Sequence, residues 1–204
     1  MRFNKVLICG CARSGNTLML NLMSHGFEGV HTLCGEIVPK QDMSGFTVIG
    51  KRPIELMNLE RHLQTMAAIL MVRYPKDVLI SSLKRKHHVL PERWISTAKK
   101  IIQFEKHDKV KVVYYEKLIL NHHDVQQELS EFLDLPINVP FNECYKYFNK
   151  KDKHNIQAMH GIRPLDESRV FAWKLRSDEH AFLNWAYKKY PEFIELENHF
   201  YPKI

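Results

Sequence analysis

The most constraining feature of this sequence is a glycine-bounded segment near its start, Gly10-Cys11-Ala12-Arg13-Ser14-Gly15-Asn16-Thr17. The segment follows an apolar run over residues 5–9 and precedes a run of helical character that begins at Leu18. A turn of this kind between a strand and a helix presents backbone N–H groups and the positive end of the helix dipole to an anion. The segment therefore predicts a phosphate-binding loop.

The loop departs at one position from the ATP-binding pattern G-x-x-x-x-G-K-[ST]. Asn16 stands where that pattern has Lys, and the cation lies inside the loop, at Arg13. This displacement keeps an anion site but argues against ordinary ATP–Mg²⁺ chemistry. The residues that we expect to hold a phosphate group are Arg13, Ser14, Gly15, Asn16 and Thr17.

Short apolar runs alternate with segments of helical pattern along most of the chain. The predicted strands are 5–9, 30–33, 46–49, 68–72 and 110–114, and the predicted helices are 17–25, 53–64, 77–86, 91–107 and 124–133. Most of these strands are continuously apolar, which is typical of a parallel sheet covered on both faces. The sequence predicts a single domain over 1–204, a three-layer α/β/α fold with a central, mostly parallel sheet and P-loop NTPase-like topology. We expect a loop over 149–160 and one or two helices within 177–204.

Composition limits the class of protein. The 204 residues are 45% hydrophobic with few Gly and Pro, as in a globular domain. The net charge of +7 fits nucleic acid, an acidic membrane surface, a polyanionic cofactor or simply a solvated face. The four Cys lack metal-site spacing, and the apolar run over 5–9 is too short for a signal peptide or a membrane span. We therefore expect a cytoplasmic protein with free thiols.

Charged residues also follow the later predicted strands, where ligands bind in an open parallel sheet. Lys51 and Arg52 follow the third strand, and Arg73 ends the fourth. A P-loop NTPase would use an Asp at such a position to hold Mg²⁺. Ser81 and Arg85 share a face of the next predicted helix. Together with Arg73 they predict a second phosphate site.

The motifs, and their order along the chain, resemble those of the sulfotransferases that depend on PAPS (3′-phosphoadenosine 5′-phosphosulfate). The matching segments are 11–19 for the 5′-phosphosulfate loop, 72–86 for the 3′-phosphate site, 113–118 for the Tyr-Glu-x-Leu segment, and Arg163-Pro164-Leu165-Asp166 with Trp173-Lys174 for the late loop over the nucleotide. Cys34-Gly35-Glu36 is similar to an element of the tyrosylprotein sulfotransferases and their bacterial relatives. Ala12, Asn16 and Tyr74 depart from the family pattern, which usually has Pro, Thr and Asp or Asn there.

The resemblance implies transfer of a sulfuryl group from PAPS to a hydroxyl, or less readily an amine, with PAP (adenosine 3′,5′-bisphosphate) as product and without a metal. It implies Glu36 as the catalytic base, with Arg13 and Lys51 also catalytic and Arg52 as a further possible contact. The implied nucleotide-binding residues are Arg13, Ser14, Gly15, Asn16, Thr17, Arg73, Ser81, Arg85, Tyr115, Arg163 and Lys174. The acceptor stays open among glycans, peptide tyrosines, lipids and small molecules, and we expect neither nucleic acid nor a membrane span.

Two other functions compete with this interpretation. A small-molecule or nucleotide kinase would share the loop, but Asn16 and Arg73 stand where it needs Lys and a Mg²⁺-binding Asp. A basic nucleic-acid-binding module is supported by the net charge alone. The oligomeric state is not readable from the sequence.

Overall fold

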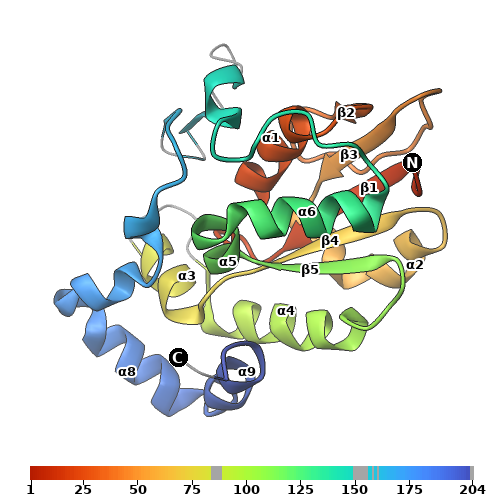
Figure 1. Cartoon of the computed structure of the whole chain (residues 1–204). Coiled ribbons are helices and arrows are strands. Elements are labelled where there is room, and N and C mark those ends of the chain that lie inside the picture. Colours follow the sequence, from red (N-terminus) through yellow and green to blue (C-terminus); the bar gives the residue numbers. More distant parts are fainter. Residues whose placement is uncertain (84–88, 149–155, 158, 160, 203–204) are drawn as a thin grey trace.

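The structure, a computed structural model, describes residues 1–83, 89–148, 156–157, 159 and 161–202. Within these ranges one sheet runs through the molecule (Figure 1). Its strands are β1 (Lys5–Gly10), β2 (Val30–Thr32), β3 (Thr47–Lys51), β4 (Ala67–Val72) and β5 (Val110–Tyr114). Their order is β2-β3-β1-β4-β5, and each neighbouring pair is parallel. The predicted parallel sheet is confirmed.

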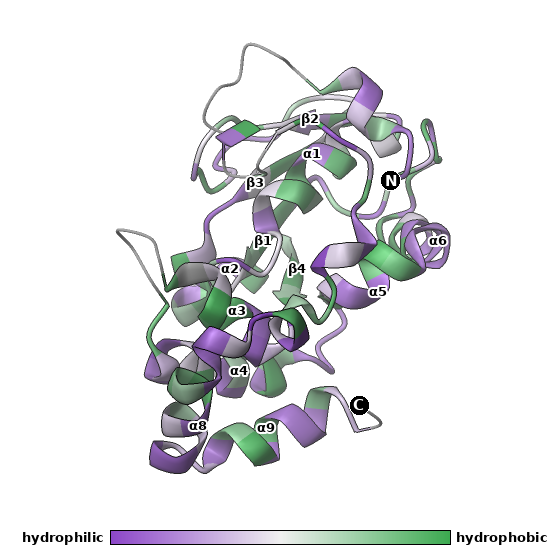
Figure 2. Cartoon of the chain, turned by 90° about the vertical axis from the view of Figure 1, so that its left-hand side faces the viewer, coloured by the Kyte–Doolittle hydropathy of each residue, from purple (hydrophilic) through white to green (hydrophobic). Residues whose placement is uncertain are grey.

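Helices cover both faces of the sheet (Figures 1 and 2). One layer contains α1 (Asn16–Gly26), α5 (Tyr115–Leu120) and α6 (His122–Leu133). The other contains η1 (Pro53–Asn58), α2 (Leu59–Leu63), α3 (Pro75–Ser82), α4 (Pro91–Phe104), α8 (His180–Lys189) and α9 (Glu192–Phe200). Four short 3₁₀ turns follow α6 along the chain, η2 (Cys144–Tyr147), η3 (Glu167–Arg169), η4 (Ala172–Leu175) and η5 (Ser177–Glu179).

The apolar strands supply two hydrophobic cores, one on each face. Leu7 and Cys9 of β1 belong to the core under α4 and α9, while Val6 and Ile8 belong to the core under α1 and α6. All four side chains are fully buried. Because successive strand residues point to opposite faces, a continuously apolar strand is needed when both faces are covered. The predicted three-layer α/β/α architecture is therefore confirmed.

The predicted helix over 53–64 forms as two short pieces, the 3₁₀ helix η1 and the helix α2. Leu56 and Leu59 are both buried and stand three residues apart. Residues three apart lie on the same face of a 3₁₀ helix, whereas one face of an α-helix is formed by residues spaced alternately three and four apart. The Glu55 carboxylate pairs with His62 at 2.9 Å, which links η1 to α2.

Two other elements differ from expectation. Helix α5 was not predicted, because Tyr114, Tyr115 and Glu116 were interpreted only as a polar cluster at a strand end. The helix begins at Tyr115, directly after β5, and buries Leu118 and Ile119. The helix predicted over 77–86 spans Pro75–Ser82, and residues 84–88 lie outside the described ranges. Most of the loop predicted over 149–160 also lies outside them.

The carboxyl ends of the parallel strands meet at one edge of the sheet, which faces the viewer in Figure 2. The loops after β1, β3, β4 and β5 leave the sheet there, so this edge positions the candidate site. Two helices expected within 177–204 are present as α8 and α9, and α9 packs on α4. Among the described helices, none is both long and apolar enough to cross a membrane.

Candidate active site

The glycine-bounded segment forms a tight loop between β1 and α1. Gly15 has φ 92°, a left-handed conformation, and a Cβ atom there would lie 2.7 Å from Cδ2 of Tyr115. The position therefore requires glycine both for its backbone and for the close approach of the ring. Arg13 has φ 71° in the same left-handed region, which is uncommon for a residue with a side chain and is typical of functional loops.

Contacts within the segment hold the loop together. The Ser14 N–H donates to Cys11 O at 3.2 Å, and Asn16 Nδ2 donates to the same oxygen at 2.9 Å. We expected the Asn16 amide to donate to the bound anion, whereas in the structure it braces the loop. The Ser14 side chain is fully buried and lines a small interior space beneath the loop. Ser14 and Asn16 therefore shape the loop by contacts inside it.

A cavity of about 430 Å³ opens beside this loop. Its polar wall contains Arg13, Gly15, Asn16, Thr17, Glu36, Lys51, Arg73, Tyr115, Arg163, Asp166 and Arg169. Its apolar wall includes Leu18, Ile119, Phe148, Met159 and Leu165. The volume falls in the range of ligand pockets, which are mostly apolar with a few placed polar groups. Most of the predicted site residues are therefore brought to one place from distant parts of the chain.

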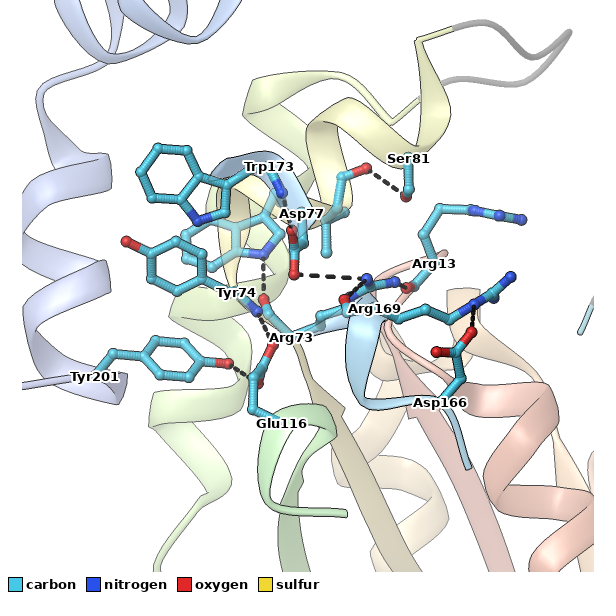
Figure 3. Close-up of polar contacts among 12 residues, drawn as sticks. Arg13, Arg73, Tyr74, Asp77, Ser81, Glu116, Asp166, Arg169, Trp173 and Tyr201 are labelled. Atoms are coloured by element: carbon cyan, nitrogen blue, oxygen red, sulfur yellow. Dashed lines mark hydrogen bonds and ion pairs between the residues drawn. The ribbon is translucent and has the colours of Figure 1, made fainter. Parts of the chain in front are cut away.

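Arg73, which directly follows β4, has several partners in this wall (Figure 3). Its guanidinium donates to Arg13 O at 3.2 Å and to Arg169 O at 2.9 Å, and it lies 3.6 Å from the Asp77 carboxylate. It also stacks over the Tyr115 ring, 4.2 Å from the centroid. Its Nε atom is buried and has no hydrogen-bond partner among the described residues. Arg73 thus joins the early loop to the late one and lines the cavity between them.

Burial dominates the electrostatics around Arg73. It raises the pKa of the Asp77 carboxyl, although Arg73 and the N–H of Trp173 act in the opposite direction. It also raises the pKa of the Tyr115 hydroxyl and of Glu116. A dry, low-dielectric wall strengthens the attraction between a guanidinium and an anionic ligand.

The late segment forms the opposite wall of the cavity. Asp166 accepts hydrogen bonds from the N–H and hydroxyl of Ser168 at the start of η3, and its other oxygen lies 3.3 Å from Arg169 Nε. The same carboxylate is 3.6 Å from Arg163. Asp166 therefore holds two arginines against the cavity.

Lys51 and Glu36 lie on the third side, after β3 and β2. Lys51 ends β3, is only 3% exposed, and donates from Nζ to Thr17 Oγ1 at 2.5 Å. The preceding Gly50 passes close to the 37–39 segment, where a Cβ atom would lie 2.2 Å from Ile37 O. Glu36, which immediately precedes that segment, is exposed and lines the cavity. A buried ammonium and an exposed carboxylate thus face the same space.

Three predicted nucleotide-binding side chains do not line the cavity. The Ser81 hydroxyl donates to Val78 O, one turn back in α3, at 3.0 Å. Lys174 is exposed and its ammonium lies 5.3 Å from the centre of the Phe171 ring. Ser14 is the third, as described above. Arg85 lies outside the described residues.

Sequence reasoning missed several residues that the structure places in or behind the wall. Asp166 and Arg169 stand within the late segment, yet only Arg163 and Lys174 were assigned a role there. Phe148, Met159 and Ile119 follow no motif, because apolar wall residues leave no local pattern. Among the described residues, no group of three or more His, Cys, Asp or Glu is arranged to hold a metal ion.

The fold is similar to solved structures of sulfotransferases at low sequence identity. The sulfotransferase domain of the Synechococcus PCC 7002 olefin synthase has a TM-score of 0.67 and 14% identity, over 85% of this chain and 88% of that one. The sulfotransferase domain from the curacin biosynthetic pathway has a TM-score of 0.63 and 14% identity, over 85% and 91%. Retinol dehydratase, in a complex with retinol and PAP, has a TM-score of 0.58 and 11% identity, over 95% and 82%.

No family model matches the sequence, and neither does any curated protein. The likeness lies in the arrangement of strands and helices. The chain has the sulfotransferase fold.

Proposed function

We propose that this protein is a sulfotransferase that moves the sulfuryl group of PAPS to a hydroxyl acceptor. One observation carries the proposal: the loop between β1 and α1 and Arg73, which follows the neighbouring strand β4, line the same cavity. Two anion-binding groups in one pocket suit a nucleotide with phosphates at two positions. The fold supports the proposal, since one structure that shares it contains PAP.

The cavity suits each part of such a nucleotide. Backbone N–H groups of the loop and the Arg13 side chain are placed for the 5′-phosphosulfate, at the start of α1. Arg73 is placed for the 3′-phosphate, to which a guanidinium can donate two parallel hydrogen bonds. Leu18, Ile119 and Phe148 form an apolar surface suited to the flat face of adenine.

The chemistry that we propose is an in-line displacement at sulfur. The acceptor oxygen forms a bond to sulfur while the bond from sulfur to the 5′-phosphate oxygen breaks, and that oxygen keeps the electron pair. Glu36 takes the acceptor's proton as the bond forms. Lys51 and Arg13 stabilise the charge that grows on the departing phosphate, which is worth about 3–4 kcal/mol for one preorganised donor.

The position of Glu36 fits a base that meets its acceptor at the cavity mouth. Its carboxylate is exposed, whereas Lys51 lies buried against Thr17 at the start of α1. A proton acceptor on the open side and a cation on the loop side are the arrangement that an in-line displacement needs. The acceptor would enter from the side of Glu36.

The two rival functions fit the cavity less well. A kinase would need an acidic residue at the neighbouring strand end to hold Mg²⁺, but Arg73 directly follows β4 there, and the Asp166 carboxylate is paired with two arginines. A nucleic-acid module would present its cations on an open face, whereas Lys51 is buried and the Arg73 side chain is only 11% exposed.

Thermal unfolding with three ligands in parallel tests the proposal. We expect PAP at about 100 times its Kd to stabilise the protein by about 2.7 kcal/mol, which corresponds to roughly 5–10 °C for a chain of this size. ATP–Mg²⁺ and an oligonucleotide serve as the matched comparisons. Stabilisation by ATP–Mg²⁺ without stabilisation by PAP would contradict the proposal.

Several finer points belong to the same proposal. The acceptor is a hydroxyl compound whose identity the cavity does not specify, and residues 1–204 act as one domain. A reduced, cytoplasmic location fits the four cysteines, none of which forms a disulfide in the described chain.

A further inference from the structure

The peptide bond that follows Arg73 lies just beyond the end of β4 and is held by side chains. The last residue of β4, Val72, still pairs with Tyr114 of β5. Beyond Val72 the backbone has no neighbouring strand to bond with, so a buried N–H or C=O there needs a hydrogen-bond partner from a side chain. The Trp94 indole donates to Arg73 O at 3.4 Å, and the Tyr74 N–H donates to the Glu116 carboxylate at 2.9 Å.

Glu116 is in turn held by the C-terminal part of the chain. The Tyr201 hydroxyl donates to its second oxygen at 2.8 Å, so that each carboxylate oxygen has one donor (Figure 3). Tyr201 directly follows α9, and both Glu116 and Tyr201 are less than a tenth exposed. A buried carboxylate that loses one of its donors becomes costly to keep in place.

A second link joins α9 to the same turn through the Tyr74 side chain. The Tyr74 hydroxyl donates to the Glu197 carboxylate of α9, which also accepts a hydrogen bond from Tyr187 of α8. The Tyr74 ring packs edge-on against Tyr201, with ring centres 5.2 Å apart. Tyr74 replaces the Asp or Asn that is usual in the resembling family, so this link belongs to this chain's own sequence.

Neither Glu197 nor Tyr201 lines the cavity, yet both contact Tyr74, the residue next to Arg73: Glu197 through a hydrogen bond and Tyr201 through its ring. We propose that the end of α9, through Glu197 and Tyr201, positions Arg73 for the 3′-phosphate of the nucleotide. Tyr74 and Glu116 transmit this support as positioning residues. The inference rests on the proposed function, because it concerns the affinity for one phosphate group of the proposed ligand.

The 5′ side of the cavity is supported differently, so the two sides can be separated by experiment. The loop is closed by hydrogen bonds to Cys11 O from residues within its own segment. Loosening the α9 links should therefore weaken recognition of the 3′-phosphate and leave recognition of the 5′-phosphate nearly unchanged. A general loss of stability would weaken both equally.

Calorimetric titration of PAP and of adenosine 5′-phosphate (AMP), which lacks the 3′-phosphate, tests the inference. We compare the wild type with Tyr74→Phe and Tyr201→Phe, each of which removes one hydroxyl and keeps its ring. Tyr190→Phe is the matched control, since the hydroxyl that it removes donates to Glu92, outside the contacts that join α9 to the Arg73 turn. We expect the Kd for PAP to rise about three- to tenfold in Tyr74→Phe and Tyr201→Phe, with the Kd for AMP within twofold of wild type.

The control should lower the melting temperature and keep the ratio of the two Kd values. An unchanged ratio in both Tyr74→Phe and Tyr201→Phe overturns the inference, and so does a parallel rise of both Kd values. If the wild type prefers PAP and both variants keep the wild-type ratio of the two Kd values, the inference is contradicted and the proposed function is not. A wild-type protein that binds PAP no more tightly than AMP contradicts the proposed function and, with it, the inference.

Discussion

The two anion-binding groups of the cavity are built in different ways. The loop between β1 and α1 is closed by bonds that span three and five residues, from Ser14 and Asn16 to Cys11 O. Arg73 is held by Arg13 O and Arg169 O, which lie 60 and 96 residues away in the sequence. The first group is a local structure, whereas the second exists only when the chain is folded.

The difference teaches which changes should affect chemistry and which should affect binding. Groups around the loop meet the atoms that react in the proposed transfer, so their loss should lower the turnover number. In the same proposal, groups around Arg73 hold a phosphate that does not react, so their loss should lower affinity. The predictions below test this division, beginning with the largest expected effect.

Glu36→Gln should abolish most turnover and spare nucleotide binding. The amide keeps the size of the side chain but cannot accept a proton, and general-base catalysis typically contributes about 10²–10⁴-fold. Release of PAP from PAPS, with a panel of phenols, sugars and tyrosine peptides as acceptors, measures the rate. The Kd for PAP should stay within twofold of wild type. Normal turnover in this variant would place the base elsewhere.

Lys51→Met should lower kcat by about 10²–10³, the usual cost of one preorganised charge-stabilising donor. Methionine keeps the length of the buried side chain but removes the ammonium that contacts Thr17. Lys109→Met is the matched control, because Lys109 donates to Leu63 O and lines a separate pocket away from the active-site cavity. Equal losses in the two variants would show a general effect on the fold.

Arg73→Ala should raise the Kd for PAP by about 10- to 100-fold, the range expected for hydrogen bonds to a charged group. The Kd for AMP should change much less, because AMP carries no 3′-phosphate. Arg93→Ala, an exposed arginine on α4, controls for the loss of one positive charge. Titration calorimetry measures both ligands. A similar rise for PAP and AMP would break the distinction between the two anion-binding groups.

Gly15→Ala should weaken PAP and AMP together, by about tenfold. The new methyl group would meet the Tyr115 ring and strain a left-handed backbone, at a cost of about 1–2 kcal/mol. Gly45→Ala is the matched control, with φ 80° and nothing within 4 Å of its Cβ position. Gly45→Ala should lose a similar amount of stability and keep the wild-type affinities for PAP and AMP. Selective loss of PAP binding in Gly15→Ala would contradict the local role of the loop.

Asp77→Asn should have the smallest effect, a change in stability of about 1 kcal/mol or less at pH 7. The asparagine side chain can still accept a hydrogen bond from the Trp173 N–H. The substitution removes a carboxyl whose pKa is raised by burial. A carboxyl whose pKa is higher in the folded state than in the unfolded state contributes most stability at a pH below the unfolded-state pKa. That contribution is lost as the pH rises through the folded-state pKa. Wild type should therefore gain stability relative to Asp77→Asn as the pH falls from 7 toward 4, measured by thermal unfolding. The opposite trend would mean that the Arg73 ion pair outweighs burial.

The sequence was a good guide wherever a signal is local. The parallel sheet followed from apolar runs, and β5 has the predicted bounds because polar residues flank its apolar run on both sides. Helix α5 was missed because its first residues, Tyr115 and Glu116, have no capping pattern, and the fold alone starts a helix there. The helix over 53–64 was predicted as one element because its leucines suit either helical type.

The candidate site divides in the same way. The early loop, Lys51 and Arg73 were found because each follows a strand, and the carboxyl ends of parallel strands meet at one edge. Phe148 and Met159 were not found, since apolar residues that line a cavity match no sequence motif. Ser81 matched a motif, but its hydroxyl bonds to its own helix instead of lining the cavity.

The sequence by itself determined that this chain has a tight, glycine-bounded loop on a parallel α/β sheet, because Gly15 and the apolar strands act over short stretches of chain. Only the tertiary structure decided how Arg73 is held, since its support comes from Arg169, Glu116 and α9. These contacts bridge between 42 and 123 residues of sequence. Hydrogen bonds over such separations leave no periodic trace in a sequence, because they form only after the sheet has brought distant segments together.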